Sequence, residues 1–226
     1  MRAILILAVA LGIFGCGQPS FDLREPIYLV AEDSFWQGCE DDVVGYEACA
    51  AERAAIIYDS VDMWFRHWPA KNRPFAVLVH EGHDVPGSNE PVYLKIDETE
   101  CRSRPGVIVA SCFSWGPDDP VKIIFKEPKY VTVNIMTHEF GHVLGLDDNT
   151  APDGKISIMS YGIWEVCVVP LDIEMVCELH REVKCPTVVW CEGAFAYRYH
   201  CPSASPEEGF NRPYSAGHNC DLWPAL

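Results

Sequence analysis

The sequence predicts an α+β domain with a cysteine-rich extension after it. A short apolar run is followed by a helical pattern at residues 46–68, and then by several short apolar runs separated by Pro, Gly, Asn and Asp. A second helical pattern, at residues 130–144, carries two histidines four positions apart. A strand, a helix and then consecutive strands are typical of an α+β domain, and 226 residues are enough for one well-filled core.

The first strand is expected at residues 27–32, which read "IYLVAE". The helix at residues 46–68 should end before Pro69, because proline lacks the amide donor that a continuing helix needs. Apolar side chains recur in this helix at helical spacing, which predicts that one face is buried in the core: Ile57, Val61, Trp64, Phe65 and Trp68.

Four further strands are expected after this helix, each bounded by turn-forming residues: 75–81, 91–97, 106–114 and 121–127. The helix at residues 130–144 should stop at Gly145, since glycine readily takes the left-handed conformation that ends many helices. A last helix is expected at residues 170–183, with Pro170 at its start.

The charge of the chain excludes one large class of partners. Thirty-three acidic residues against 17 basic ones give a formal net charge of −16. A phosphate backbone would be repelled by such a protein, so we expect no nucleic-acid partner.

The first residues indicate export. After Arg2 the run "AILILAVALGIF" suits a secretory signal but is shorter than the ~20 residues that span a bilayer as a helix, so residues 1–15 are expected to be a signal peptide. The following "IFGCGQ" resembles the bacterial lipobox, which implies that Cys16 is lipidated and that residues 16–25 form a tether. The protein is then expected in the bacterial cell envelope, anchored by this lipid, or outside the cell. Ordinary signal cleavage is the alternative.

The cysteines agree with export. Without Cys16, ten of the eleven remain, an even number that predicts up to five disulfides in an oxidising compartment. Residues 185–226 hold several of them and have weak periodicity, so this extension is expected to fold through disulfides. No C-x-x-C spacing occurs, which argues against a zinc ribbon or a thioredoxin-like site.

The segment "MTHEFGHVLGLDDNT" predicts a zinc site. Helix positions four apart differ by about 40° around the axis, so His138 and His142 lie on one face and can share an ion. Glu139 points elsewhere but can reach a water on that ion. Catalytic zinc usually takes a third protein ligand.

The third ligand is expected just beyond the helix. Gly145 allows the chain to turn sharply, which can bring a side chain back to the metal three residues later, at Asp148. A carboxylate oxygen is a competent zinc ligand, although the short side chain requires the backbone to come close. Asp147 is the neighbouring candidate.

These motifs resemble those of a known family. "HEFGHVLGLDD" resembles the signature H-E-x-x-H-x-x-G-x-x-H/D of the metzincin zinc peptidases, whose last position is Asp in the snapalysin-like group and His in matrixin-like members. "SIMSYG", residues 157–162, is similar to their Met-turn. The resemblance covers residues 26–184 and implies a zincin-like domain: a twisted mixed sheet, an active-site helix, a Met-turn and a C-terminal helix.

The resemblance also implies roles for individual residues. The strand at 106–114 would be an antiparallel edge that pairs with an extended peptide. Tyr161 matches a tyrosine that lies near the metal in some groups, where it would stabilise the oxyanion or simply pack. The remaining roles are zinc ligation by His138, His142 and Asp148, general base catalysis by Glu139, and packing beneath the metal by the Met-turn residue Met159.

The function expected from the sequence is an exported zinc metalloendopeptidase, acting as a monomer on protein or peptide substrates. A non-catalytic zinc-binding surface lipoprotein derived from a metzincin fold is the alternative, and a zinc hydrolase with another substrate is a third possibility. Retention of Glu139 favours an enzyme, because a purely structural zinc needs no base there. The membrane would be contacted only through the lipid at Cys16.

Overall fold

The computed structural model describes residues 21–39, 43–101, 109–116, 119–148, 157–159, 168 and 170–186. The expected signal peptide, the lipidation site Cys16, Tyr161 and the extension beyond residue 186 lie outside these residues. Within them, no helix has both the length and the apolar character needed to cross a bilayer.

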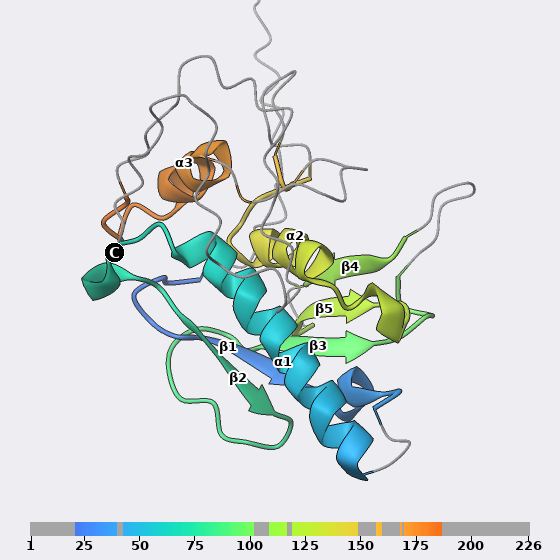
Figure 1. The fold of residues 1–226 in the computed structure, drawn as a ribbon. Coiled ribbons are helices and arrows are strands. Elements are labelled where there is room, and N and C mark those ends of the chain that lie inside the picture. The colour runs from blue at the N-terminus through green and yellow to red at the C-terminus, as the bar shows by residue number, and fades with distance from the viewer. Residues whose placement is uncertain are drawn as a thin grey trace, which may run out of the picture.

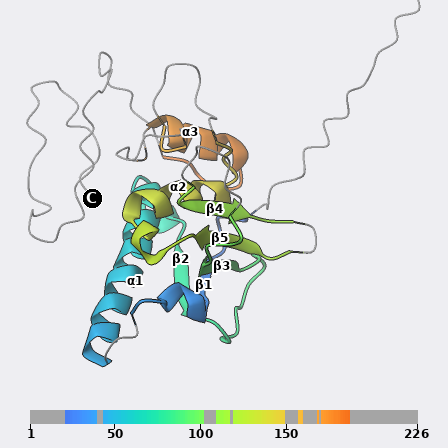
Figure 2. The ribbon, with the colours of Figure 1, turned by 90° about the vertical axis from the view of Figure 1, so that its right-hand side faces the viewer.

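Five strands form one mixed sheet in the order β2-β1-β3-β5-β4 (Figures 1 and 2). The strands pair in parallel except at β4, which is antiparallel to β5. All five expected strands are present, and β4 is shorter than predicted because residues 109 and 110 are not part of it. The bounds are β1 Ile27–Ala31, β2 Ala76–His80, β3 Val92–Ile96, β4 Ser111–Ser114 and β5 Val121–Phe125.

Three helices complete the described part of this α+β fold: α1 Val43–Phe65, α2 Val133–Val143 and α3 Pro170–Leu179. Figure 1 shows α1 crossing one face of the sheet, with α2 beside it near β4, while α3 lies beyond α2. The helix α3 ends four residues earlier than predicted, at Leu179 rather than at residue 183, because the chain turns there and the amide of Val183 donates to the carbonyl of His180.

The apolar stripe predicted for α1 is buried, with at most 7% exposure for any of its members. The helix ends at Phe65 rather than at residue 68. The amide of Trp68 donates to the carbonyl of Phe65, so a turn already leads the chain toward Pro69. Trp68 is still fully buried, since its ring packs edge-on against Phe65 at a centroid distance of 5.9 Å.

Polar contacts fasten α1 to α2 within this apolar interface. Trp64 Nε1 donates a buried hydrogen bond of 2.8 Å to the carbonyl of Thr137. Ser60 Oγ donates to the Ile56 carbonyl at 2.7 Å within α1 and also lies 3.0 Å from the carbonyl oxygen of Val133. A buried donor without a partner would cost about 1–3 kcal/mol, so the Trp64 bond fixes the position of α2 along α1.

Three disulfides are formed among the described residues: Cys39–Cys49, Cys101–Cys112 and Cys177–Cys185. They confirm the prediction of a disulfide-bonded protein. The other four predicted half-cystines, Cys167, Cys191, Cys201 and Cys220, lie outside the described residues.

Candidate metal centre

The helix α2 holds both histidines and begins later than the sequence predicts. Residues Pro128–Tyr130 form a separate 3₁₀ turn, and the helix starts at Val133 with Thr132 as its N-cap. The Thr132 hydroxyl accepts a hydrogen bond from the amide of Ile135, which satisfies one of the unpaired amides at the start of a helix.

The turn at the end of α2 brings Asp148 back to the helix. Gly145 has a φ of 85°, and the amides of Gly145 and Leu146 donate to the carbonyls of His142 and Gly141. This pair of bonds is the Schellman arrangement, which ends a helix and reverses the chain. Glycine suits this position because it adopts a positive φ without steric strain.

Three side chains converge at this turn. Oδ1 of Asp148 lies 3.1 Å from Nε2 of His138 and 3.4 Å from Nε2 of His142. One potential ligand atom from each residue lies within 4.8 Å of the other two, and this is the one such group of His, Cys, Asp and Glu among the described residues. Ligand atoms held 2.0–2.2 Å from a tetrahedral zinc ion are about 3.3–3.6 Å apart; the contact with His142 lies in this range and the contact with His138 lies slightly below it.

Backbone carbonyls orient both imidazoles. His138 Nδ1 lies 2.8 Å from the carbonyl oxygen of Ile158, and His142 Nδ1 lies 2.7 Å from that of Leu146. A carbonyl can only accept, so each Nδ1 carries the proton and each Nε2 presents its lone pair or a second proton to Asp148. Such a contact on the outer nitrogen is the usual support for a metal-ligating histidine.

The electrostatics of the three residues favour a cation. Burial lowers the pKa of His138, but the hydrogen bond to Asp148, the charge of Glu139 and the Ile158 carbonyl together raise that pKa to about 9. The pKa of His142 is also raised, since burial is outweighed by Asp148 and Glu139. The carboxylates thus favour a positive charge between them, and either a proton or a metal ion can supply it.

A serine of the sheet holds the carboxylate of Glu139 in place. Its side chain is 4% exposed, and Oε1 accepts a hydrogen bond of 2.5 Å from Ser111 Oγ on β4. The other oxygen, Oε2, is buried and has no hydrogen-bond partner in the described part of the chain. The next inward residue of β4, Phe113, stacks on His142 at a centroid distance of 5.5 Å.

The segment with Met159 lies directly under α2. Met159 is fully buried, and a Cβ added at Gly141 would be 2.3 Å from its sulfur. Asp172 of α3 holds the preceding residues, because it accepts hydrogen bonds from Ser157 Oγ at 2.5 Å and from the amide of Ile158 at 3.3 Å. This support passes to His138 through the Ile158 carbonyl.

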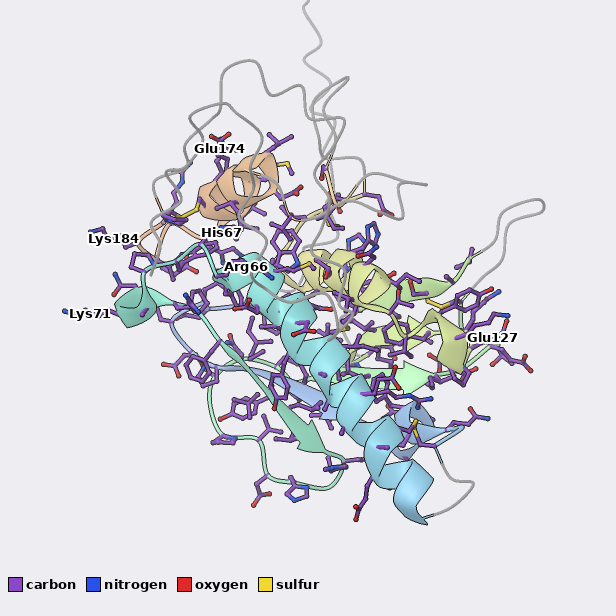
Figure 3. All side chains as sticks on the ribbon, in the orientation of Figure 1. Arg66, His67, Lys71, Glu127, Glu174 and Lys184 are labelled. Atoms are coloured by element: carbon purple, nitrogen blue, oxygen red, sulfur yellow. A yellow bond between two sulfur atoms is a disulfide. The ribbon has the colours of Figure 1, made fainter. Side chains whose placement is uncertain are left out.

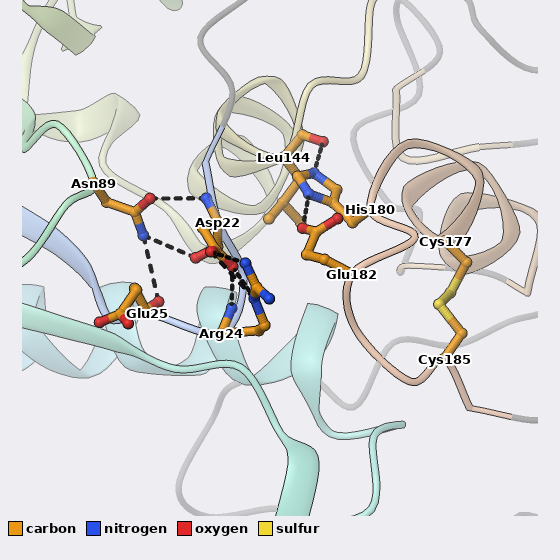
Figure 4. Close-up of polar contacts among 9 residues, drawn as sticks. All are labelled: Asp22, Arg24, Glu25, Asn89, Leu144, Cys177, His180, Glu182 and Cys185. Carbon is orange, nitrogen blue, oxygen red and sulfur yellow. Dashed lines mark hydrogen bonds and ion pairs between the residues drawn. A yellow bond between two sulfur atoms is a disulfide. The ribbon is translucent and has the colours of Figure 1, made fainter.

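A buried histidine directly after α3 holds the C-terminal end of α2 (Figure 4). His180 Nε2 lies 3.0 Å from the carbonyl oxygen of Leu144, and Nδ1 lies 3.0 Å from Oε1 of Glu182. Leu144 is the C-cap of α2, immediately before Gly145. The disulfide Cys177–Cys185 closes the loop that carries His180.

The structure therefore brings together four of the predicted site residues and places Met159 beneath them. Sequence reasoning left Asp147 as an alternative ligand, but the group with the histidines contains Asp148, and Asp147 is exposed. The supporting residues Ser111, Ser157, Asp172 and His180 were missed. Ser111 had a usable signal, since alternation along the predicted strand puts it on one face with Phe113.

Comparison with known proteins gives no family assignment. No protein-family model matches the chain, and a search of curated proteins finds no similar sequence.

Proposed function

We propose that this protein is an exported zinc-dependent endopeptidase of the metzincin type. One observation carries the proposal: His138, His142 and Asp148 converge on a single point, and beside them the buried carboxylate of Glu139 has one oxygen without a hydrogen-bond partner among the described residues. Two imidazoles and a carboxylate make a three-residue donor set of the kind found at catalytic zinc. An unpaired buried carboxylate oxygen is costly, which favours a use for it in the reaction.

His138 and His142 would hold zinc through Nε2, and Asp148 through its carboxylate. Bound there, zinc supplies a Lewis acid for a water molecule and for the carbonyl of the scissile peptide. Glu139 takes the proton from the attacking water at Oε2, while the water oxygen forms a bond to the carbonyl carbon. Glu139 then gives this proton to the leaving nitrogen as the C–N bond breaks, which restores the carboxylate.

The position of β4 supports a peptide as the substrate. β4 is the last strand of the sheet on the side of α2, and no described strand pairs with its outer edge. Such an edge can bind an extended peptide through main-chain hydrogen bonds. The proposal includes action as a monomer, without a nucleic-acid partner.

Two further parts of the proposal concern residues outside the described ranges. Tyr161 would stabilise the oxyanion. Cys16 would carry a lipid that anchors the protein in the bacterial cell envelope, or the protein would be released outside the cell. The disulfides of the folded domain support export, because such bonds persist in oxidising compartments.

The test is cleavage of a disordered protein by the oxidised, zinc-loaded chain, compared with Glu139→Gln. Gln keeps the size of the side chain but cannot accept the proton, so cleavage should disappear while zinc remains stoichiometric. Glu127→Gln, which removes a carboxylate paired with Lys129 on the surface (Figure 3), is the matched control and should cleave normally. A metal chelator should abolish cleavage by the wild type.

Stoichiometric zinc without cleavage by the wild type would contradict the proposal and favour a zinc-binding surface protein. Equal cleavage by the wild type and Glu139→Gln would remove Glu139 as the base.

A further inference from the structure

We propose that Ser111 is a positioning residue that selects Oε2 of Glu139 as the oxygen that moves the proton. This inference rests on the proposed function and adds a residue to its reaction. It starts from the asymmetry of the Glu139 carboxylate, in which Ser111 Oγ donates to Oε1 at 2.5 Å and Oε2 has no partner in the described part of the chain.

The asymmetry matters because the last torsion of a glutamate is soft. Rotation about this bond exchanges the two oxygens at little cost, so an unheld carboxylate spreads over many orientations. A hydrogen bond to one oxygen removes this freedom. Ser111 therefore keeps Oε2 in one direction before substrate arrives, as a catalytic group requires.

Ser111 can do this because its own backbone is fixed on several sides. It pairs with Phe125 in the antiparallel ladder of β4 and β5, and the amide of Lys126 donates to the carbonyl of Ala110 at 2.9 Å. The next residue, Cys112, is tied by its disulfide to Cys101, which is 3% exposed.

The side chains on the two faces of β4 thus have different roles. Ser111 and Phe113 face α2, where they contact Glu139 and His142, whereas Cys112 points to the opposite side and holds the strand. Ser114 also lies on the side away from Ser111, since side chains alternate along a strand. Ser114 consequently provides a control with the same side chain on the same strand.

The first experiment measures kcat, KM and zinc affinity for Ser111→Ala, Ser111→Thr and Ser114→Ala. Loss of a hydrogen bond to a charged group predicts a decrease of about 10- to 100-fold in kcat for Ser111→Ala, with KM and zinc affinity unchanged. Thr retains the hydroxyl and should restore most of kcat, and Ser114→Ala should behave as the wild type. A kcat for Ser111→Ala within about 2-fold of the wild type would overturn the role of Ser111.

The second experiment needs no catalysis. Ser111→Ala is placed in the wild type and in Glu139→Ala, and urea unfolding of the metal-free proteins is compared. Ser111→Ala should lower the urea midpoint in the wild type and have a much smaller effect in Glu139→Ala, because the partner is then gone. Equal effects in the two backgrounds would overturn the inference.

The two experiments also separate this inference from the proposed function. Zinc-loaded wild type that cleaves no substrate overturns the proposed function and, with it, the role of Ser111 in catalysis. An active wild type with a Ser111→Ala variant that loses zinc, or that changes only KM, overturns the inference alone.

Discussion

Gly141 should not tolerate even one added methyl group, although it lies inside a helix where alanine is normally preferred. A Cβ at this position would be 2.3 Å from Sδ and 3.1 Å from Cε of Met159, and 2.9 Å from Cζ2 of Trp64. Carbon and sulfur atoms in proteins pack at about 3.5–4 Å. Met159 is fully buried, so Gly141→Ala forces it to move by roughly 1 Å or more within a filled core.

For Gly141→Ala, the cost of overpacking exceeds the gain in helix propensity. Overpacking of this kind costs about 1–3 kcal/mol, and replacing glycine by alanine in a helix returns about 1 kcal/mol. Gly141→Ala should therefore lower the free energy of unfolding by up to about 2 kcal/mol. It should also weaken zinc binding, because Met159 follows Ile158, whose carbonyl orients His138.

Urea unfolding of the oxidised protein measures this change, and a double variant isolates the contact. Met159→Ala alone should cost about 2–5 kcal/mol for the cavity, but it removes two of the three atoms that crowd the new methyl group, Sδ and Cε of Met159, and leaves Cζ2 of Trp64. Gly141→Ala should then cost much less in the Met159→Ala background than in the wild type, because the shortest contact is gone. Gly45→Ala, at an exposed position of α1, gives the helix-propensity gain in the same protein. Effects that add to within about 0.5 kcal/mol would refute a direct contact between residues 141 and 159.

Three further substitutions test a proposed metal ligand, a partly buried histidine and a disulfide. Asp148→Ala should lower zinc affinity by about 100-fold or more in a chelator competition assay, because a direct ligand is worth at least as much as its supporting contacts; unchanged affinity would exclude Asp148 as a ligand. Burial and two neighbouring arginines lower the pKa of His67 to about 4, below its unfolded value of 6.5. The unfolded state therefore binds this proton more tightly than the folded state, so the free energy of unfolding is unaffected above pH 6.5 and falls by about 2 kcal/mol as the pH decreases toward 4. Urea midpoints should accordingly depend less on pH in His67→Asn than in the wild type or in the exposed control His80→Asn. Replacing Cys101 and Cys112 by Ser opens a loop with a separation of 11 residues and should cost about 3 kcal/mol in urea unfolding, a prediction that fails if the midpoint stays the same.

The parts of the fold that the sequence predicted well are those with local causes. The periodicity of α1 and the short apolar runs of the strands identify elements because a few neighbouring residues determine which side is buried. Helix ends were less accurate, since they depend on single hydrogen bonds such as that of the Thr132 hydroxyl.

In the candidate site, too, the residues that are close in sequence could be predicted and the contacts between distant segments could not. His138, His142 and Asp148 lie within one short segment, so their approach could be predicted from helix geometry and one glycine. The supporting contacts join distant segments: Ser111 is 28 residues from Glu139, and a serine or a histidine on a predicted element has no pattern that reveals its partner. Only the fold determines which of them meet.

The way in which α2 ends explains how the side chain of Asp148 reaches the two histidines. An aspartate is shorter than a histidine, so its backbone must come closer to His138 and His142 if its side chain is to share an ion with them. The turn at Gly145 provides that approach, because the Leu146 carbonyl lies 2.7 Å from Nδ1 of His142 and the amide of Leu146 bonds back to the helix. The chain is thus held against α2 two residues before Asp148, where the longer side chain of a histidine would have less room. The glycine turn, the carbonyl that orients His142 and the short third side chain are consequently parts of one arrangement, and a change in one of them should alter the other two.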